Sequence, residues 1–131
     1  MMLNRSRMET LIVIGIAGFI GANVRYFVGS WSAAQFGTAF PWGTLIINLT
    51  GSTFLAMFFA WASSRTGLDP RVRLFVAVGF FGAYTTFSTY ANDSAALITS
   101  GAWLGVVANI LLENFLCVSG ALIGYAVGSH L

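Results

Sequence analysis

The chain has 131 residues, of which 57% are hydrophobic and only 8% are charged, and its formal net charge is +2. Soluble domains carry about 25% charged residues, so this composition excludes a soluble domain and indicates a membrane protein. Lysine is absent, and 6 arginines are too few and too scattered to form a nucleic-acid surface.

The sequence contains four apolar segments long enough to cross a bilayer, at about residues 10–29, 42–62, 74–98 and 102–127. An α-helix needs about 20 residues to span about 30 Å of hydrocarbon. Because the connections between the segments are short, we expect one all-α membrane domain over residues 1–131, without a soluble appendage.

The first segment follows Arg5 and Arg7, a pattern that also begins a secretory signal peptide. Three further apolar segments, and the polar residues Asn23 and Arg25, favour a retained helix instead. If the four segments alternate in direction, Arg25 lies near one side and five arginines lie on the other: Arg5, Arg7, Arg65, Arg71 and Arg73. The positive-inside rule then predicts that both termini lie in the cytoplasm.

Small residues recur along the first and fourth segments at spacings that let membrane helices approach closely. They are Gly15, Gly18 and Gly21 in the first, and Gly120, Gly124 and Gly128 in the fourth. Packing within the chain and packing between subunits are both open. Since four short helices do not easily enclose a pathway, we expect a dimer or larger assembly if the chain transports anything.

In the second segment Thr44, Asn48 and Ser52 recur every four residues and share one helix face. An amide in hydrocarbon is unfavourable without a partner. Asn48 therefore has two open interpretations: an interhelical hydrogen bond, or donation of its NH₂ group to a passing anion.

The third segment carries glycines and hydroxyl residues at bilayer depth, which predicts a functional region there. Non-helical backbone survives at this depth only where protein or water satisfies it. If the helix unwinds between Gly82 and Thr85, the freed carbonyl groups form a site for a hard cation such as Na⁺.

Phe87 and Tyr90, three residues apart, share a helix face beside Ser88 and Thr89. In most proteins an aromatic pair at this spacing serves only to pack against neighbouring side chains. The positive edges of the two rings are also suited to a small anion.

Three pieces of the sequence, GANVRY (21–26), PWGTLIINLTGS (41–52) and GFFGAYTTFSTY (79–90), carry a resemblance to a known family. The chain resembles the Fluc-type fluoride channels of the CrcB family, strongly over the first three segments and weakly over the fourth. The resemblance implies an antiparallel dimer with two anion pathways along the subunit interface and a third helix broken near its middle.

The resemblance also implies residue roles. A structural Na⁺ at the dimer centre maps to the backbone carbonyl groups of Gly82 and Thr85, and Arg25 maps to a structural or electrostatic arginine. The anion pathway maps to Asn48, Phe87, Ser88, Thr89 and Tyr90.

The chain departs from the family at several positions. Tyr90 replaces the commoner phenylalanine, Asp93 stands where glutamate is frequent, and Asn109 and Glu113 replace tyrosine and serine. A carboxylate at Glu113 repels fluoride unless it is protonated or paired. A structural interpretation pairs it with an arginine or with Asn114. A functional interpretation is a modified pathway that is altered, pH-sensitive or closed.

The function implied by the resemblance is passive export of cytoplasmic fluoride across a bacterial plasma membrane. The arginine bias leaves a dual-topology homodimer and one half of a heterodimer both open. Two alternatives are a small multidrug exporter, for which Glu9 and Glu113 are badly placed, and a structural membrane subunit. An enzyme is not expected, because His130 is the only histidine and no catalytic set is visible.

Overall fold

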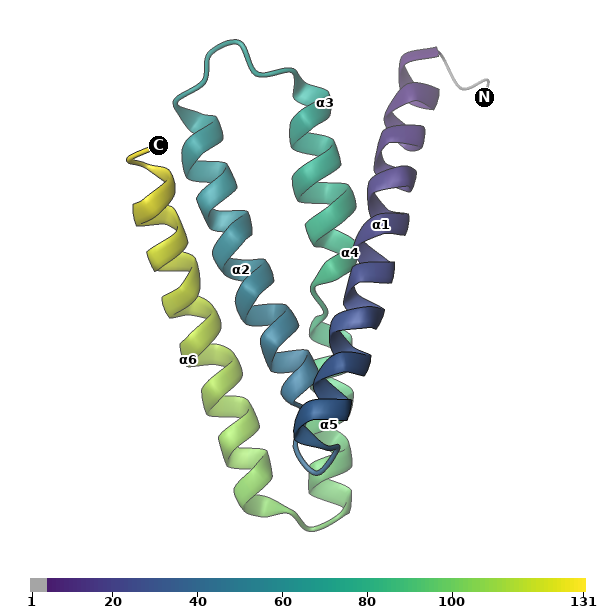
Figure 1. The fold of residues 1–131 in the computed structure, drawn as a ribbon, viewed down its shortest axis with the longest axis vertical. Coiled ribbons are helices and arrows are strands. Elements are labelled where there is room, and N and C mark those ends of the chain that lie inside the picture. The colour runs from purple at the N-terminus through teal and green to yellow at the C-terminus, as the bar shows by residue number, and fades with distance from the viewer. Residues whose placement is uncertain (1–4) are drawn as a thin grey trace.

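The computed structural model describes residues 5–131, and all regular secondary structure in that range is helical (Figure 1). In chain order the elements are α1 (Arg5–Phe36), α2 (Trp42–Ser63), α3 (Pro70–Arg73), the π-helix η1 (Leu74–Phe81), α4 (Gly82–Tyr84), α5 (Phe87–Thr99) and α6 (Trp103–Gly128). By length and composition, four stretches can cross a membrane: α1, α2, the run Pro70–Thr99 and α6.

The four predicted segments are therefore confirmed, and their limits differ most for the first. That segment was expected at about residues 10–29, whereas α1 covers Arg5–Phe36. The additional turns at both ends are more polar than the apolar centre, so hydropathy alone does not include them. A helix of this length extends beyond the hydrocarbon at its ends.

Local chemistry explains where the helices begin and end. α1 ends before Gly37, and the turn between α5 and α6 contains Gly101; both glycines have positive φ, 77° and 73°. Residues with a side chain rarely adopt this conformation. Pro70 begins α3 behind Asp69, whose carboxylate accepts the Arg71 backbone N–H at 2.8 Å. This is the usual arrangement of a capped helix start with proline at its first position.

The glycine run of α6 packs against α2 within the same chain. A Cβ atom at Gly124 would collide with the backbone carbonyl of Thr53, and one at Gly128 with that of Met57. In α1, a Cβ atom at Gly21 would collide with the carbonyl of Phe80, whereas one at Gly15 would meet nothing within 4 Å. Packing within the chain thus accounts for the α6 run and for Gly21.

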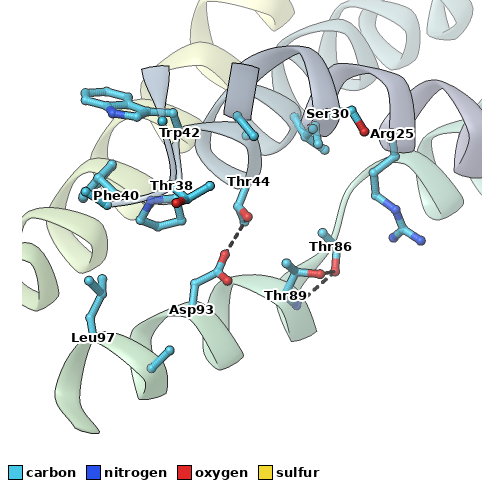
Figure 2. Close-up of a pocket in the computed structure, with 18 of the residues that line it drawn as sticks. Arg25, Ser30, Thr38, Phe40, Trp42, Thr44, Thr86, Thr89, Asp93 and Leu97 are labelled. Atoms are coloured by element: carbon cyan, nitrogen blue, oxygen red, sulfur yellow. Dashed lines mark hydrogen bonds between the residues drawn. The ribbon is translucent and has the colours of Figure 1, made fainter. Parts of the chain in front are cut away.

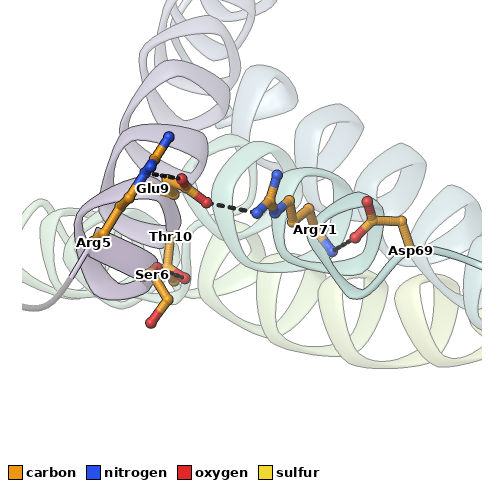
Figure 3. A network of polar contacts seen from close by, with 6 residues as sticks. All are labelled: Arg5, Ser6, Glu9, Thr10, Asp69 and Arg71. Atoms are coloured by element: carbon orange, nitrogen blue, oxygen red, sulfur yellow. Dashed lines mark hydrogen bonds and ion pairs between the residues drawn. The ribbon is translucent and has the colours of Figure 1, made fainter.

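Figure 1 shows α6 alongside α2 and α1 alongside the stretch from α3 to α4. Both ends of the described chain and the α2–α3 connection lie at one end of the bundle. At that end Glu9 pairs with Arg71 at 2.6 Å and with Arg5 at 3.4 Å, which joins α1 to α3 (Figure 3). The alternation behind the orientation prediction is therefore present, and the side that faces the cytoplasm stays a prediction.

Candidate functional site

The helical run in the third span is interrupted at two threonines. α4 ends at Tyr84 and α5 begins at Phe87, while Thr85 (φ −78°, ψ 157°) and Thr86 (φ −154°, ψ 110°) are extended. The sequence placed the unwinding between Gly82 and Thr85, but the backbone is still helical through Tyr84. Glycine permits an interruption without requiring one, whereas β-branched threonine favours the extended conformation.

The side chain of Asn48 occupies the interruption. The Thr86 backbone N–H donates to Asn48 Oδ1 at 2.8 Å, and Asn48 Nδ2 donates to the Thr86 carbonyl oxygen at 3.1 Å. The amide of one side chain therefore satisfies both backbone groups of a non-helical residue. This is the interhelical hydrogen bond that was one of the two interpretations of Asn48.

Four carbonyl oxygens, those of residues 82 to 85, lose their usual helical donors at the same point, and Gly82 and Thr85 are two of them. In a continuous helix the N–H of Thr86 would bond Gly82 and that of Thr89 would bond Thr85. Here the Thr86 N–H donates to Asn48, and the Thr89 N–H donates to the side chain of Thr86 at 3.1 Å. The chemistry of a hard-cation site, neutral backbone oxygens freed from a helix, is thus available at both residues predicted for it.

Glu113 of α6 lies next to Asn48 and is 5% exposed. Asn48 Nδ2 lies 3.2 and 3.4 Å from its two carboxyl oxygens, and the Cys117 thiol donates to one of them at 3.5 Å. Neither predicted partner is present. Asn114 donates to Ile110 and Tyr90 instead, and both ion pairs in residues 5–131 involve Glu9.

Asn109, one helical turn before Glu113, is 1% exposed. Its Nδ2 donates to the hydroxyl of Ser94 at 3.0 Å, and its Oδ1 has no hydrogen-bond partner. Asn109 therefore ties α6 to α5 and lines neither of the cavities described below.

A cavity of about 300 Å³ surrounds the pair formed by Asn48 and Glu113. Phe87 and Tyr90 also line it, with their rings edge to face at 5.4 Å, and Phe87 is 78% exposed. The other lining residues are Ser52, Leu55, Thr85, Thr86, Asn114, Cys117 and Val118.

A larger cavity of about 800 Å³ lies on the other side of Thr86, near the α1–α2 and α5–α6 turns. Figure 2 shows Arg25, Thr44, Thr89 and Asp93 on its wall, with Thr44 donating to Asp93 at 2.6 Å. Thr86 lines both cavities.

The residues predicted for one pathway are thus divided between two cavities. Asn48, Phe87 and Tyr90 line the smaller one, and Thr89 lines the larger one together with Arg25. Ser88 lines neither, although its hydroxyl lies 3.2 Å from that of Thr86. Thr86 joins the two groups of residues.

Sequence reasoning did not single out Thr86 or the bond between Thr44 and Asp93. A signal for Thr86 was available, since threonine is a good helix N-cap and its side chain accepts the N–H three residues later, at Thr89. For the bond between Thr44 and Asp93, the indication in the sequence is weaker. Thr44 shares a helix face with Asn48, but nothing in the sequence aims that face at Asp93.

Four apolar spans define a multi-pass integral membrane protein, and polar side chains contribute to the walls of its two cavities. The family model described as CrcB-like protein, Camphor Resistance (CrcB), matches residues 12–125. The chain therefore belongs to the CrcB family, which confirms the resemblance carried by its three sequence pieces.

Relatives extend this match over most of the chain. A protein of Koribacter versatilis (strain Ellin345) named fluoride-specific ion channel FluC is 44% identical over 109 residues, 83% of this chain and 86% of the relative. Two proteins with the same name, from Chloroflexus aurantiacus (strain ATCC 29366 / DSM 635 / J-10-fl) and Sulfurihydrogenibium sp. (strain YO3AOP1), are 39% and 40% identical. Those matches cover 92% and 95% of this chain and 93% and 100% of the relatives.

Proposed function

We propose that this chain forms a passive, fluoride-specific ion channel in a bacterial plasma membrane. The proposal of fluoride as the transported ion rests on the family, since the relatives above are named fluoride-specific ion channels. Hydrogen fluoride enters a cell as a neutral acid and dissociates, so the anion accumulates in the cytoplasm. A passive pathway driven by the membrane potential lets it leave and limits its toxicity. A channel makes no covalent bond, so no catalytic residue is assigned.

The residues around the interruption suit the transfer of a small, strongly hydrated anion. Fluoride loses water in a narrow pathway and needs hydrogen-bond donors in exchange. Ser88 and Thr89 can supply them, and Asn48 can do so when its NH₂ group is not bonded to Glu113. The positive ring edges of Phe87 and Tyr90 attract the anion without a fixed cation that would trap it. α5 begins at the same place, and a helix N-terminus favours negative charge.

A structural Na⁺ belongs to the proposal. The carbonyl oxygens of Gly82 and Thr85 would hold it, because the N–H groups that normally bond them are diverted to Asn48 and Thr86. When bound, the cation supplies a fixed positive charge that holds the interrupted backbone together. The carbonyl end of one half-helix facing a cation and the N–H end of the next facing an anion is a recurrent arrangement in transporters.

We propose an antiparallel dimer as the conducting unit. Phe87, Ser88 and Thr89 are all exposed in this chain at the depth of a membrane span. Polar groups at that depth need protein or water around them, and a second subunit over α5 provides the protein. A dual-topology homodimer needs a nearly balanced arginine count, so the five-to-one bias also supports one half of a heterodimer.

The test is fluoride efflux from liposomes that contain only this purified chain, followed with a fluoride electrode after a potassium ionophore is added. Chloride efflux is the control for leakage. Fluoride release without chloride release supports a homodimeric channel. If the protein is folded and silent, reconstitution with a homologous chain of opposite arginine bias tests the heterodimer. Silence in that mixture as well would refute the proposed channel.

A further inference from the structure

Glu113 places an acidic group where the proposed pathway needs hydrogen-bond donors. It lies in an apolar span, is 5% exposed and lines the smaller cavity with Asn48, Phe87 and Tyr90. Its hydrogen-bond donors are Asn48 Nδ2 and the Cys117 thiol. None of the residues lining that cavity is an arginine, so no cation there offsets the carboxylate.

The hydrogen bonds of Asn48 leave no donor for a free anion. Its Oδ1 accepts from the Thr86 backbone, and its NH₂ group donates both to the Thr86 carbonyl and to Glu113. An amide NH₂ group has two protons. A carboxylate and fluoride are both anionic acceptors, so the proton now directed at Glu113 is the one that fluoride would use.

Glu113 is the one carboxyl group among the residues that line the smaller cavity. α2 contributes Asn48, Ser52 and Leu55 to the cavity, none of which is charged. α5 contributes the rings of Phe87 and Tyr90, and neither is a charged side chain. The cavity of about 300 Å³ gives the Glu113 side chain space to move aside.

We propose that the Glu113 carboxylate is a tethered competitor of the transported anion. It holds the anion position at Asn48, and fluoride enters the smaller cavity of this chain only when the Glu113 side chain leaves Asn48. The inference rests on the proposed function and adds a control on flux at the same site. The pathway of this chain is therefore slower, and binds fluoride more weakly, than the same pathway without the carboxylate.

Two substitutions separate the shape of Glu113 from its charge. Glu113→Ser removes both the bond to Asn48 and the charge, whereas Glu113→Gln keeps the shape and an acceptor for Asn48. In the liposome assay we expect Glu113→Ser to conduct fluoride at least about tenfold faster than the wild type, with Glu113→Gln in between. Glu9→Gln is the matched control, since Glu9 lies in the arginine network outside both cavities. It should leave the rate unchanged.

A second measurement separates this inference from the proposed channel. The melting temperature of each purified protein is followed against fluoride, with chloride as the control, because a ligand that binds only the folded state raises it. We expect Glu113→Ser to respond at a lower fluoride concentration than the wild type. This response supports the competition even if no protein conducts, in which case only the channel is refuted.

The inference is overturned if the wild type conducts fluoride and Glu113→Ser conducts no faster. If Glu113→Ser does not fold, Glu113→Gln decides, and a rate equal to that of the wild type overturns it. If no protein conducts, the same fluoride dependence of melting in wild type and variant overturns it.

Discussion

Asn48 in α2 is bonded twice to the backbone of Thr86: Thr86 N–H to Oδ1 at 2.8 Å and Nδ2 to the Thr86 carbonyl oxygen at 3.1 Å. The side-chain amide of Asn48 and the backbone of Thr86, 38 positions apart in the sequence, thereby exchange two hydrogen bonds. The bonds give a non-helical residue the partners that a helix would have supplied, which permits the interruption at membrane depth. Asn48 is thus a structural residue as well as a proposed pathway residue.

Asn48→Asp should suppress fluoride flux by at least about tenfold. The substitution removes the NH₂ group that binds Thr86 and Glu113, and it places a second carboxylate beside the first. Losing donors to buried acceptors should also destabilise the fold by about 1–3 kcal/mol. Efflux and thermal unfolding of the same preparation measure both effects.

Asn23→Asp is the control for that substitution. Asn23 also lies in a membrane span, but it lines neither cavity, and within residues 5–131 its side chain bonds only Phe19 of its own helix. An unchanged rate in Asn48→Asp would place Asn48 outside the pathway. An equal loss in Asn23→Asp would mean that any new carboxylate in a span stops the flux.

Phe87→Ile should abolish fluoride flux and leave the assembled protein intact. The side chain is 78% exposed in the single chain, so its replacement should change the folding free energy by no more than about 0.5 kcal/mol. Isoleucine has no ring edge to offer an anion. Efflux measured beside size-exclusion chromatography separates conduction from assembly.

Phe115→Ile makes the same change at a phenylalanine of α6 that is 71% exposed and lines neither cavity. It should conduct normally. Normal flux in Phe87→Ile would remove the argument from ring edges and leave the hydroxyl groups of α5 as the donors to examine.

The sequence predicts those features that depend on local composition. Hydropathy over about 20 residues suffices for the four spans, and the glycine spacing in α6 suffices for a close helix contact. The partners of Asn48 cannot be predicted from local composition. It meets Thr86 and Glu113 across 38 and 65 residues, and no periodicity along one segment specifies which faces of α2, α5 and α6 meet.

The position of the interruption shows the same limit on a smaller scale. Gly82 suggested that the helix unwinds from that residue. Glycine permits a non-helical conformation but does not determine where the helix ends. Thr86 fixes the position, because its backbone pairs with Asn48 and its side chain caps α5. The cap is a local feature, but Asn48 cannot be identified as the partner of Thr86 until the helices are packed.

The proposed Na⁺ site predicts that sodium raises the melting temperature of the purified protein, because a ligand that binds only the folded state stabilises it. Thr86→Val should weaken that response. The Thr86 hydroxyl accepts the Thr89 N–H and caps α5 directly beside the carbonyl of Thr85 that is proposed for the cation, and valine removes this cap and loosens the backbone there. Loss of the cap alone should cost about 1 kcal/mol. Melting curves in sodium and in N-methylglucamine buffers measure both effects.

Thr99→Val is the matched control, since its hydroxyl bonds Ala96 near the end of α5 and is exposed. It should keep the full sodium response. Equal responses in wild type and Thr86→Val would count against a cation at Gly82 and Thr85.

Gly124→Ala should destabilise the protein and slow fluoride flux together. The added Cβ would collide with the backbone carbonyl of Thr53, so α2 and α6 must separate. Overpacking of this kind destabilises by about 1–3 kcal/mol. Asn48 lies on the same helix as Thr53, and Glu113 on the same helix as Gly124, so a separation at this contact changes the wall of the smaller cavity.

Gly15→Ala is the matched control, because a Cβ atom at Gly15 meets nothing within 4 Å. It should leave both stability and flux unchanged. Denaturant unfolding in detergent and efflux from liposomes are measured on both variants. If Gly124→Ala loses stability but conducts normally, the smaller cavity does not depend on the α2–α6 distance. The pathway then belongs to the surface of α5, where Phe87, Ser88 and Thr89 are exposed.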